Sequence, residues 1–224
     1  MEIPDPTKRF YCRECKRENY HRPVTTGKVD KAPVLIKGTA YRYQTYELMK
    51  CNECKTLTLC INNKINPGGM IGDSYLESTD YFPPLPARDR PDWLENLGPQ
   101  ISKLIEEVYK SIDYSLLCVA STGIRTVLDR IITDKIGDCG SFENKTEKVV
   151  KNGLIDSDEK ELLLAVIDTG SASAHRGFDP DESIINSMVD IMEKIIYKIC
   201  IIPVNKKELK RKADLLREKT PKRK

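Results

Sequence analysis

Apolar residues recur at every third or fourth position through the second half of the chain, the spacing that places them on one face of an α-helix. Three such sets follow Pro99. In chain order they are Ile101, Leu104, Ile105, Val108, Tyr109 and Ile112; then Ile124, Val127, Leu128, Ile131 and Ile132; then Ile184, Ile185, Met188, Ile191, Met192, Ile195, Ile196 and Ile199. The short connections and the lack of a strand pattern predict an all-α bundle over 99–203.

Polar residues indicate where these helices begin and end. Asp113 is placed to cap a helix that runs to about residue 134, unless the first two sets form one continuous, broken helix. A short helix over 145–152 would end at Gly153, and the acids from Asp156 onward suit the N-terminus of the next helix. The last stripe, on 181–200, is wider than one neighbour needs, which predicts a homodimer through this face.

The first part of the chain has the alternation of β-strands instead. Residues 41–49 and 56–61 are rich in Thr and aromatic residues, and they stand on either side of Cys51 and Cys54 as the strands of a hairpin would. The fold class that we expect is therefore α+β, with a small β unit over 1–65 followed by the helical bundle.

Two further segments have neither pattern. Pro and Gly punctuate 66–98, which predicts a linker whose Tyr81, Phe82 and Trp93 pack onto a neighbouring domain. After Pro203, which should stop the last helix, residues 204–224 form a basic tail that we expect to be a frayed, solvated helix.

Composition narrows the class of protein. The 224 residues are 39% hydrophobic and 32% charged, which excludes a wholly disordered or fibrous chain. No apolar run approaches the roughly 20 residues of a membrane span, and the N-terminus has no visible secretory signal. These features predict a cytoplasmic protein with no membrane partner.

The net charge of +3 is unevenly distributed. Residues 1–64 carry +6, residues 65–205 carry −10 and residues 206–224 carry +7. If nucleic acid is a partner, the two basic ends should bind it and the acidic middle should repel it. For the tail, an equal alternative is that the basic charge only serves solubility.

Four of the eight cysteines have the spacing of metal ligands. Cys12 and Cys15 form one C-x2-C pair, and Cys51 and Cys54 form a second. Two tight turns that each present two thiolates complete a tetrahedron around zinc and leave no position for water. We therefore predict one structural zinc ion per chain in a zinc ribbon over 1–65.

Two other residues stand close enough in sequence to replace one of these ligands. His21 and Cys60 are each six positions after a cysteine of the pairs. Because two C-x2-C pairs already satisfy zinc, a surface loop imidazole and a buried thiol are the favoured interpretations. A redox C-x2-C motif would need a βαβ setting, which the sequence does not show.

The order of features resembles a known family of domains, DUF4145. The matching segments are Tyr11-Cys12, the pair Cys51 and Cys54, Tyr81-Phe82-Pro83-Pro84, the helix with Tyr109, Ile124 to Asp129, and Gly170 to His175. The resemblance runs from the first cysteine pair to about residue 200. Two positions depart from the family pattern, since Asp129 stands in place of Glu and Ser171 in place of Asn.

This resemblance implies a HEPN-like helical bundle, a group that includes ribonucleases and dimeric binding modules of phage defence. Family proteins are also joined to restriction-enzyme subunits. The nuclease signature of that group has an Arg separated from a His by four to six intervening residues on one helix. Here Asp168, Thr169 and Gly170 occupy those positions before His175, so the usual nuclease motif is absent.

Three helical residues remain as catalytic candidates. Arg125 and Asp129 are four apart on one helix, and His175 ends a stretch of small residues. The favoured interpretation is a polar network that fastens two helices around a buried histidine. The catalytic alternative makes His175 a general base and Arg125 a stabiliser of phosphorane charge.

Together these features predict a non-catalytic binding or sensor module with a structural zinc, in a phage-defence or restriction-type system. Its partners would be a second copy, nucleic acid or a defence-system protein. The alternatives are a divergent HEPN-like ribonuclease and a structural adaptor for a partner enzyme.

Overall fold

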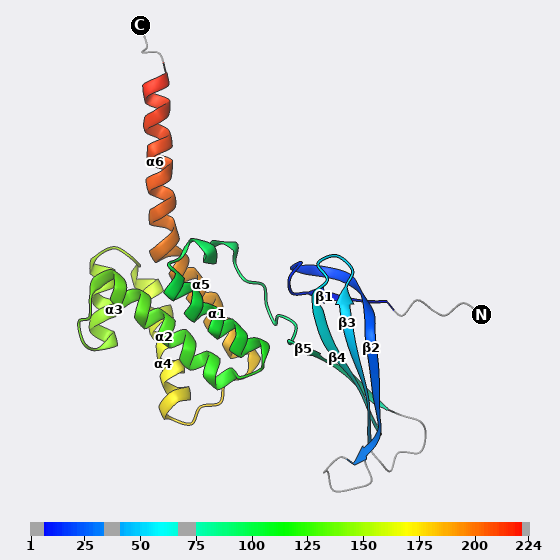
Figure 1. Ribbon diagram of the computed structural model, residues 1–224. Helices are drawn as coiled ribbons and strands as arrows, with labels where there is room; N and C mark the ends of the chain where they lie inside the picture. Colours follow the sequence, from blue (N-terminus) through cyan, green and yellow to red (C-terminus); the bar gives the residue numbers. More distant parts are fainter. Residues whose placement is uncertain (1–6, 34–40, 67–74, 221–224) are drawn as a thin grey trace. The chain divides into compact units, whose positions relative to one another are not determined.

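The computed structural model describes residues 7–33, 41–66 and 75–220, which form two compact units (Figure 1). The first, Met1–Ala87, is a β-sheet, and we call it the sheet unit. The second, Arg88–Lys224, is helical, and we call it the helical unit. The prediction of an α+β chain with the strands first is confirmed.

The sheet unit is one antiparallel sheet whose five strands are neighbours in chain order. The strands are β1 (Lys8–Cys12), β2 (Arg17–Pro33), β3 (Tyr41–Cys51), β4 (Leu57–Asn66) and β5 (Leu76–Phe82). The predicted hairpin is confirmed as β3 and β4, which pair from Lys50 opposite Leu57 to Tyr41 opposite Asn66. β2 was not expected, because its charged and Thr-rich sequence lacks regular apolar alternation.

The segment 66–98 differs from the extended linker that its prolines predict. Apart from Pro67, the prolines of this segment follow Phe82, and β5 before them pairs along β4. Further on, the short helix η1 (Asp92–Asn96) places Trp93 against the core of the helical unit. Tyr81 packs on the apolar cluster of its own sheet unit, while Phe82 is exposed.

The apolar core of the sheet unit is small. Phe10, Met49 and Cys60 are buried together, with Tyr81 and Leu85 packed against them. Further along the same face the side chains are polar: Asn62 donates to Glu47 over 2.7 Å, and Thr79 donates to Asn62 over 3.1 Å. The buried apolar area of this sheet is therefore confined to the end that carries the cysteines.

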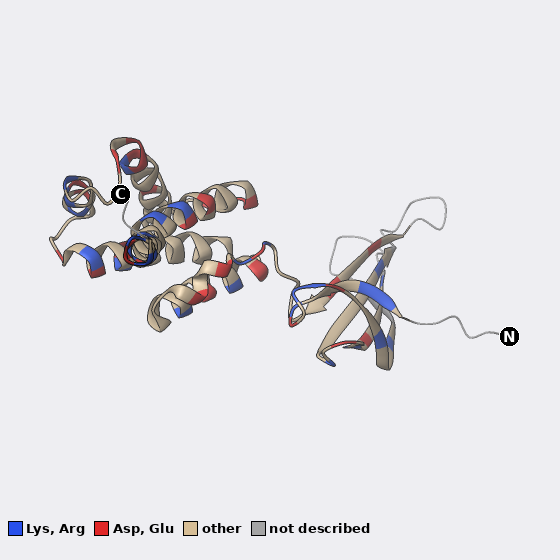
Figure 2. Cartoon of the chain, turned by 90° about the horizontal axis from the view of Figure 1, so that it is seen from above, with Lys and Arg blue, Asp and Glu red and all other residues tan. Residues whose placement is uncertain are grey.

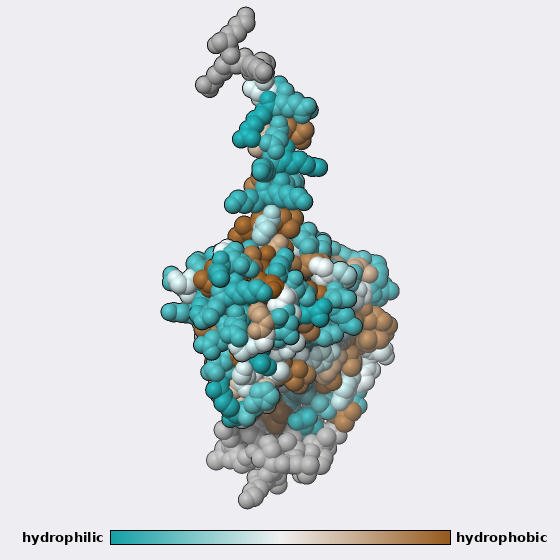
Figure 3. All heavy atoms as spheres, turned by 90° about the vertical axis from the view of Figure 1, so that its left-hand side faces the viewer, coloured by the Kyte–Doolittle hydropathy of each residue, from teal (hydrophilic) through white to brown (hydrophobic). Residues whose placement is uncertain are grey.

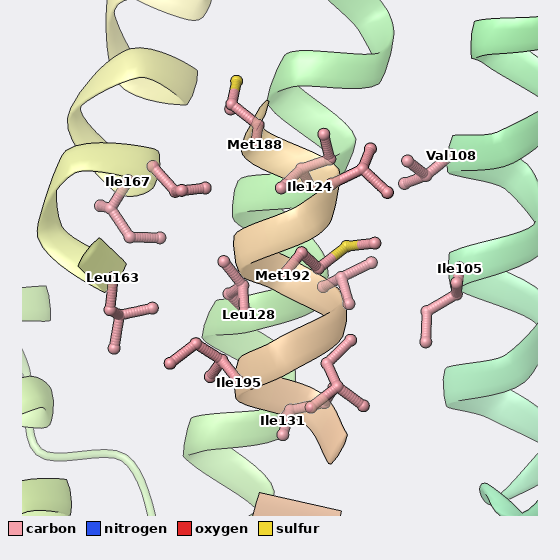
Figure 4. Close-up of a cluster of buried hydrophobic side chains, with 14 of the residues drawn as sticks. Ile105, Val108, Ile124, Leu128, Ile131, Leu163, Ile167, Met188, Met192 and Ile195 are labelled. Atoms are coloured by element: carbon pink, nitrogen blue, oxygen red, sulfur yellow. The ribbon is translucent and has the colours of Figure 1, made fainter. Parts of the chain in front are cut away.

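The helical unit has a large core. Its helices are α1 (Pro99–Asp113), α2 (Leu117–Ile136), α3 (Phe142–Lys151), α4 (Ser157–His175), α5 (Glu182–Ile196), the π-helix η2 (Tyr197–Ile201) and α6 (Ile202–Lys219). Figure 4 shows how α1, α2, α4 and α5 direct apolar side chains toward one another. The predicted helical bundle is confirmed, with α6 as an additional element.

The wide apolar stripe on α5 is buried within this core. Ile185, Met188, Met192 and Ile195 are buried, and Ile184 and Ile191 pack at the edge of the same cluster. Because α2 and α4 already pack against this face, the stripe itself gives no support to the homodimer, which stays a prediction.

Helix boundaries agree with the sequence at two places and differ at a third. Gly153, with φ of +66°, follows α3, and Asp156 forms a reciprocal capping box with Glu159 at the start of α4. Asp113, however, does not cap α2, whose N-cap is Leu116. Instead Asp113 ends α1 and accepts a 2.5 Å hydrogen bond from Arg90, which lies 5.0 Å above the Tyr109 ring.

The chain does not stop being helical at Pro203. The π-helix η2 leads directly into α6, where Pro203 stands in the first turn and its missing N–H is not needed. The prediction of a solvated helix is confirmed, because no residue of α6 is buried. Among the described residues, none of the helices has both the length and the apolar character needed to cross a bilayer.

Candidate metal centre

Two turns of the same design close one end of the sheet unit. β1 ends at Cys12 and the chain turns through Cys15 into β2, while β3 ends at Cys51 and turns through Cys54 into β4. In each turn a Lys follows the second cysteine in the left-handed region, Lys16 with φ of 53° and Lys55 with φ of 69°. The repeated Cys-x-Glu-Cys-Lys sequence therefore encodes a repeated backbone.

Strand pairing brings the two turns together. β2 lies between β1 and β3, with Arg17 opposite Cys12 and His21 opposite Cys51. The Asn52 N–H also donates to the Tyr20 carbonyl over 2.9 Å, which ties the second turn to β2. An exposed ion pair between Arg17 and Glu53 joins the two turns from outside.

The four cysteine side chains converge. Their sulfur atoms all lie within 4.8 Å of one another, as the two C-x2-C pairs predict. Across the turns, the Sγ atoms of Cys12 and Cys54 are 3.4 Å apart and those of Cys15 and Cys51 are 3.9 Å apart. Cys12 and Cys51 are buried, so the cluster is closed on its protein side and accessible only past Cys15 and Cys54.

The thiols of this cluster differ in acidity. The Thr56 hydroxyl, 3.3 Å from Cys54, and the Thr56 N–H lower the pKa of Cys54 to about 6. Removal from water and the neighbouring Cys54 sulfur raise the pKa of Cys15 to about 12, and burial raises the pKa of Cys12. Four such groups can all ionise only beside a cation, so the donor set suits a soft divalent metal.

The two substitute ligands lie outside this cluster. Cys60 is buried in the apolar cluster, where burial raises its pKa to about 11, so its interpretation as a buried thiol is confirmed. His21 was predicted in a surface loop and is instead buried on β2. Its ring stacks on Phe10 with the centroids 3.7 Å apart, and Nδ1 lies 3.0 Å from the Asn19 carbonyl.

The three helical candidates do not form the predicted network. Asp129 accepts a 2.8 Å hydrogen bond from Lys145 of α3, and among the described residues it makes no pair with Arg125. His175 is exposed at the end of α4, so the expectation of a buried histidine is wrong. A stretch of small residues indicates that another helix can pack closely against it. It does not show at which residue of the helix that contact ends.

The small-residue stretch of α4 has a packing role near its middle. A Cβ atom added to Gly170 would lie 2.7 Å from Arg125 Cβ, so Gly170 permits the contact of α4 with α2. One turn later, Ser173 donates to Ser121 of α2 over 2.9 Å. Gly170 and Ser173 therefore fasten α4 to α2 in place of the predicted network of Arg125, Asp129 and His175.

Comparison with known proteins adds one match. The family model described as Domain of unknown function (DUF4145) matches residues 106–219, which is just over half of the chain. The match begins after the cysteine pairs and continues to the end of α6, so it lies nearer the C-terminus than the segments that carry the resemblance in the sequence. No curated protein and no solved structure matches the chain.

Proposed function

The chain belongs to the DUF4145 family, a domain of unknown function, and we propose that it is a non-catalytic binding module whose sheet unit is held by structural zinc. The observation that carries this proposal is the convergence of four cysteine sulfurs within 4.8 Å of one another. Among the common metal ions, zinc is one that thiolate ligands select. Four thiolates complete its coordination and leave no position for a reacting water.

The helical unit supports a binding role over catalysis. Arg125 contacts Gly170, Asp129 pairs with Lys145, and His175 is exposed at the C-terminal end of α4. A general base and a charge stabiliser must converge on the same reacting group, and these three side chains have separate surroundings. We take the helical unit to be a HEPN-like scaffold that has no nuclease centre, in a phage-defence or restriction-type system.

The ligand that we propose for the sheet unit is single-stranded nucleic acid. Because side chains alternate along a strand, the residues next to buried Phe10, His21 and Met49 face away from the apolar cluster. They include Arg9, Tyr20, Arg22 and Lys50, and strand pairing sets Arg9 opposite Tyr20 and Arg22 opposite Lys50. Figure 2 shows basic residues along the strands of this unit.

This surface, which we call the Tyr20 surface (Arg9, Tyr20, Arg22 and Lys50), combines a stacking platform with positive charge. The Tyr20 side chain is 58% exposed, and Arg22 is exposed beside it. Arg9 forms an ion pair with Glu18, with 3.3 Å between the Arg9 Nε and a Glu18 carboxylate oxygen. An exposed aromatic ring among cations is the arrangement with which sequence-tolerant proteins bind single strands.

The test is binding and cleavage of one labelled single-stranded RNA. Tyr20→Ala should weaken the affinity about 10-fold, since stacking contributes about 1–3 kcal/mol per base. Tyr114→Ala is the matched control, because that tyrosine of the helical unit is 51% exposed. The RNA should stay intact. Equal effects of the two variants would contradict the Tyr20 surface, and cleavage that His175→Ala abolishes would establish the ribonuclease alternative.

A further inference from the structure

Helix α6 is an 18-residue element without a covered face. In Figure 3 it projects from the helical unit as a mostly hydrophilic rod with separate hydrophobic residues along it. Each of the helices α1 to α5 buries apolar residues in the core of this unit, whereas no residue of α6 is buried. Because isolated helices of this length are marginal in water, a function that uses α6 requires a surface against which it packs.

Four apolar residues of α6 have the spacing of a docking face. Ile202, Leu209, Ala213 and Leu216 follow one another at seven, four and three positions, which aligns them on one side of the helix. We call these four residues the α6 seam. Leu209 is 64% exposed and Leu216 is 68% exposed, so the centre of the seam is open to solvent.

Charge is segregated around the α6 seam. At about 100° per residue, five basic residues and no acidic residue stand directly beside it. These are Lys206, Lys210, Lys212, Arg217 and Lys219. The acids Glu208, Asp214 and Glu218 stand farther round the helix, where Glu208 pairs with Lys212 and Asp214 pairs with Arg217. The described residues offer no carboxylate to Lys206, Lys210 or Lys219.

The apolar and charged residues of α6 favour one kind of binding partner for the seam over the others. A second copy of α6 is disfavoured, because pairing the two seams in parallel would bring Lys212 of each helix beside Lys210 and Arg217 of the other. A membrane surface is disfavoured, because the seam is a single narrow line without Trp or Phe, whereas interfacial helices bury a broad apolar face. Apolar anchors at intervals of three, four and seven, bordered by cations, fit an acidic amphipathic helix of another protein.

We propose that α6 is a docking helix that binds an acidic, amphipathic helical surface of a partner protein through the α6 seam. The family match that continues to the end of α6 supports this role, because it makes the helix part of the domain. The proposal is independent of the Tyr20 surface, which lies in the sheet unit.

The experiment uses the full chain and a labelled three-heptad peptide with Leu on one face and Glu beside it. Leu209→Gln combined with Leu216→Gln should weaken binding of this peptide at least tenfold, since two leucine side chains lose their burial. The matched control is Val204→Gln combined with Leu215→Gln, which changes residues that are 62% and 46% exposed on the opposite side. Its affinity should remain within about twofold of the unmodified chain.

Three results would overturn the proposal. Equal affinity of both double variants would mean that charge alone attracts the peptide. Binding to vesicles of phosphatidylcholine and phosphatidylserine that depends on Leu209 and Leu216 would assign α6 to membranes, and light scattering that shows seam-dependent dimers would assign it to a second copy. The same variants should leave Tyr20-dependent RNA binding unchanged, so failure here is distinguishable from failure of the proposed function.

Discussion

The sheet unit and the helical unit bury very different amounts of apolar side chain. Among the described residues, the cluster of the helical unit contains 23 buried members and that of the sheet unit contains three. Both units are nonetheless built from long, regular elements. A core of three side chains is too small to offset the conformational entropy of five ordered strands.

The cysteine cluster stands where the sheet unit has its apolar residues. Cys12 and Cys51 are buried next to the strand positions of Phe10 and Met49, so the cysteine cluster and the apolar cluster lie at the same end of the sheet. A structural zinc site contributes about 10–16 kcal/mol of binding free energy, which becomes folding free energy when the site forms only in the folded chain. With the proposed zinc bound, the two units would have two different sources of stability, metal binding in one and apolar burial in the other.

The largest expected effect is the unfolding of the sheet unit while the helical unit stays folded. Cys51→Ser removes one of the four proposed zinc ligands, so we expect the sheet unit to lose its zinc and unfold while the helical unit keeps its circular dichroism at 222 nm. Cys60→Ser is the matched control, because it makes the same change at an equally buried cysteine outside the cluster. That variant should retain zinc, as measured by elemental analysis, and lose about 1–3 kcal/mol for a buried hydroxyl.

A smaller effect is expected from a substitution in the core of the helical unit. Leu128 is fully buried on α2, where it packs with α4 and α5 (Figure 4). Leu128→Ala should lower the free energy of unfolding of the helical unit by about 2–5 kcal/mol through the lost apolar contacts and the cavity. Chemical denaturation followed at 222 nm gives this value, and zinc content should not change. A parallel loss of zinc would show that the two units do not fold independently.

The smallest effect concerns a single helix cap. The Glu159 N–H and the Lys198 ammonium lower the pKa of Asp156 to about 2. Because this is below the value of about 3.9 in an unfolded chain, the ionised cap stabilises the helical unit above pH 4 and loses that contribution as the pH falls toward 2.

Asp156→Asn isolates the charge of that cap, because Asn also accepts the Glu159 N–H. We expect its melting temperature at pH 7 to be lower by about 2–4 °C, and the difference from the unmodified chain to shrink between pH 4 and pH 2. Thermal unfolding at a series of pH values measures both. A constant difference across that range would assign the effect to packing.

Much of the architecture could be predicted from local patterns. Spacing of three and four located the helices of the bundle, and two C-x2-C pairs located the cysteine cluster, because each signal depends on residues close together in sequence. The capping acid Asp156 was found for the same reason. β2 and β5 were missed, since their pairing with β3 and β4 depends on neighbours distant in sequence.

The surroundings of single side chains were the least predictable. Asp113 has a capping residue's chemistry, but Arg90 from outside the helix binds it at the end of α1. His21 was expected in a loop and is stacked under Phe10, a contact that only the pairing of β1 with β2 creates. His175 was expected in a core and is exposed, because the packing of α4 on α2 is centred on Gly170 and Ser173.

Hydrogen exchange of the zinc-loaded full chain, measured by mass spectrometry with and without a chelator, tests most directly whether metal holds one unit and apolar burial holds the other. We expect chelation to release one zinc ion per chain and to abolish the protection of β1 to β4, while α1, α2, α4 and α5 keep theirs. A chain that contains no metal as purified and still protects β1 to β4 would contradict the account, as would a chelator that removes protection from both units together.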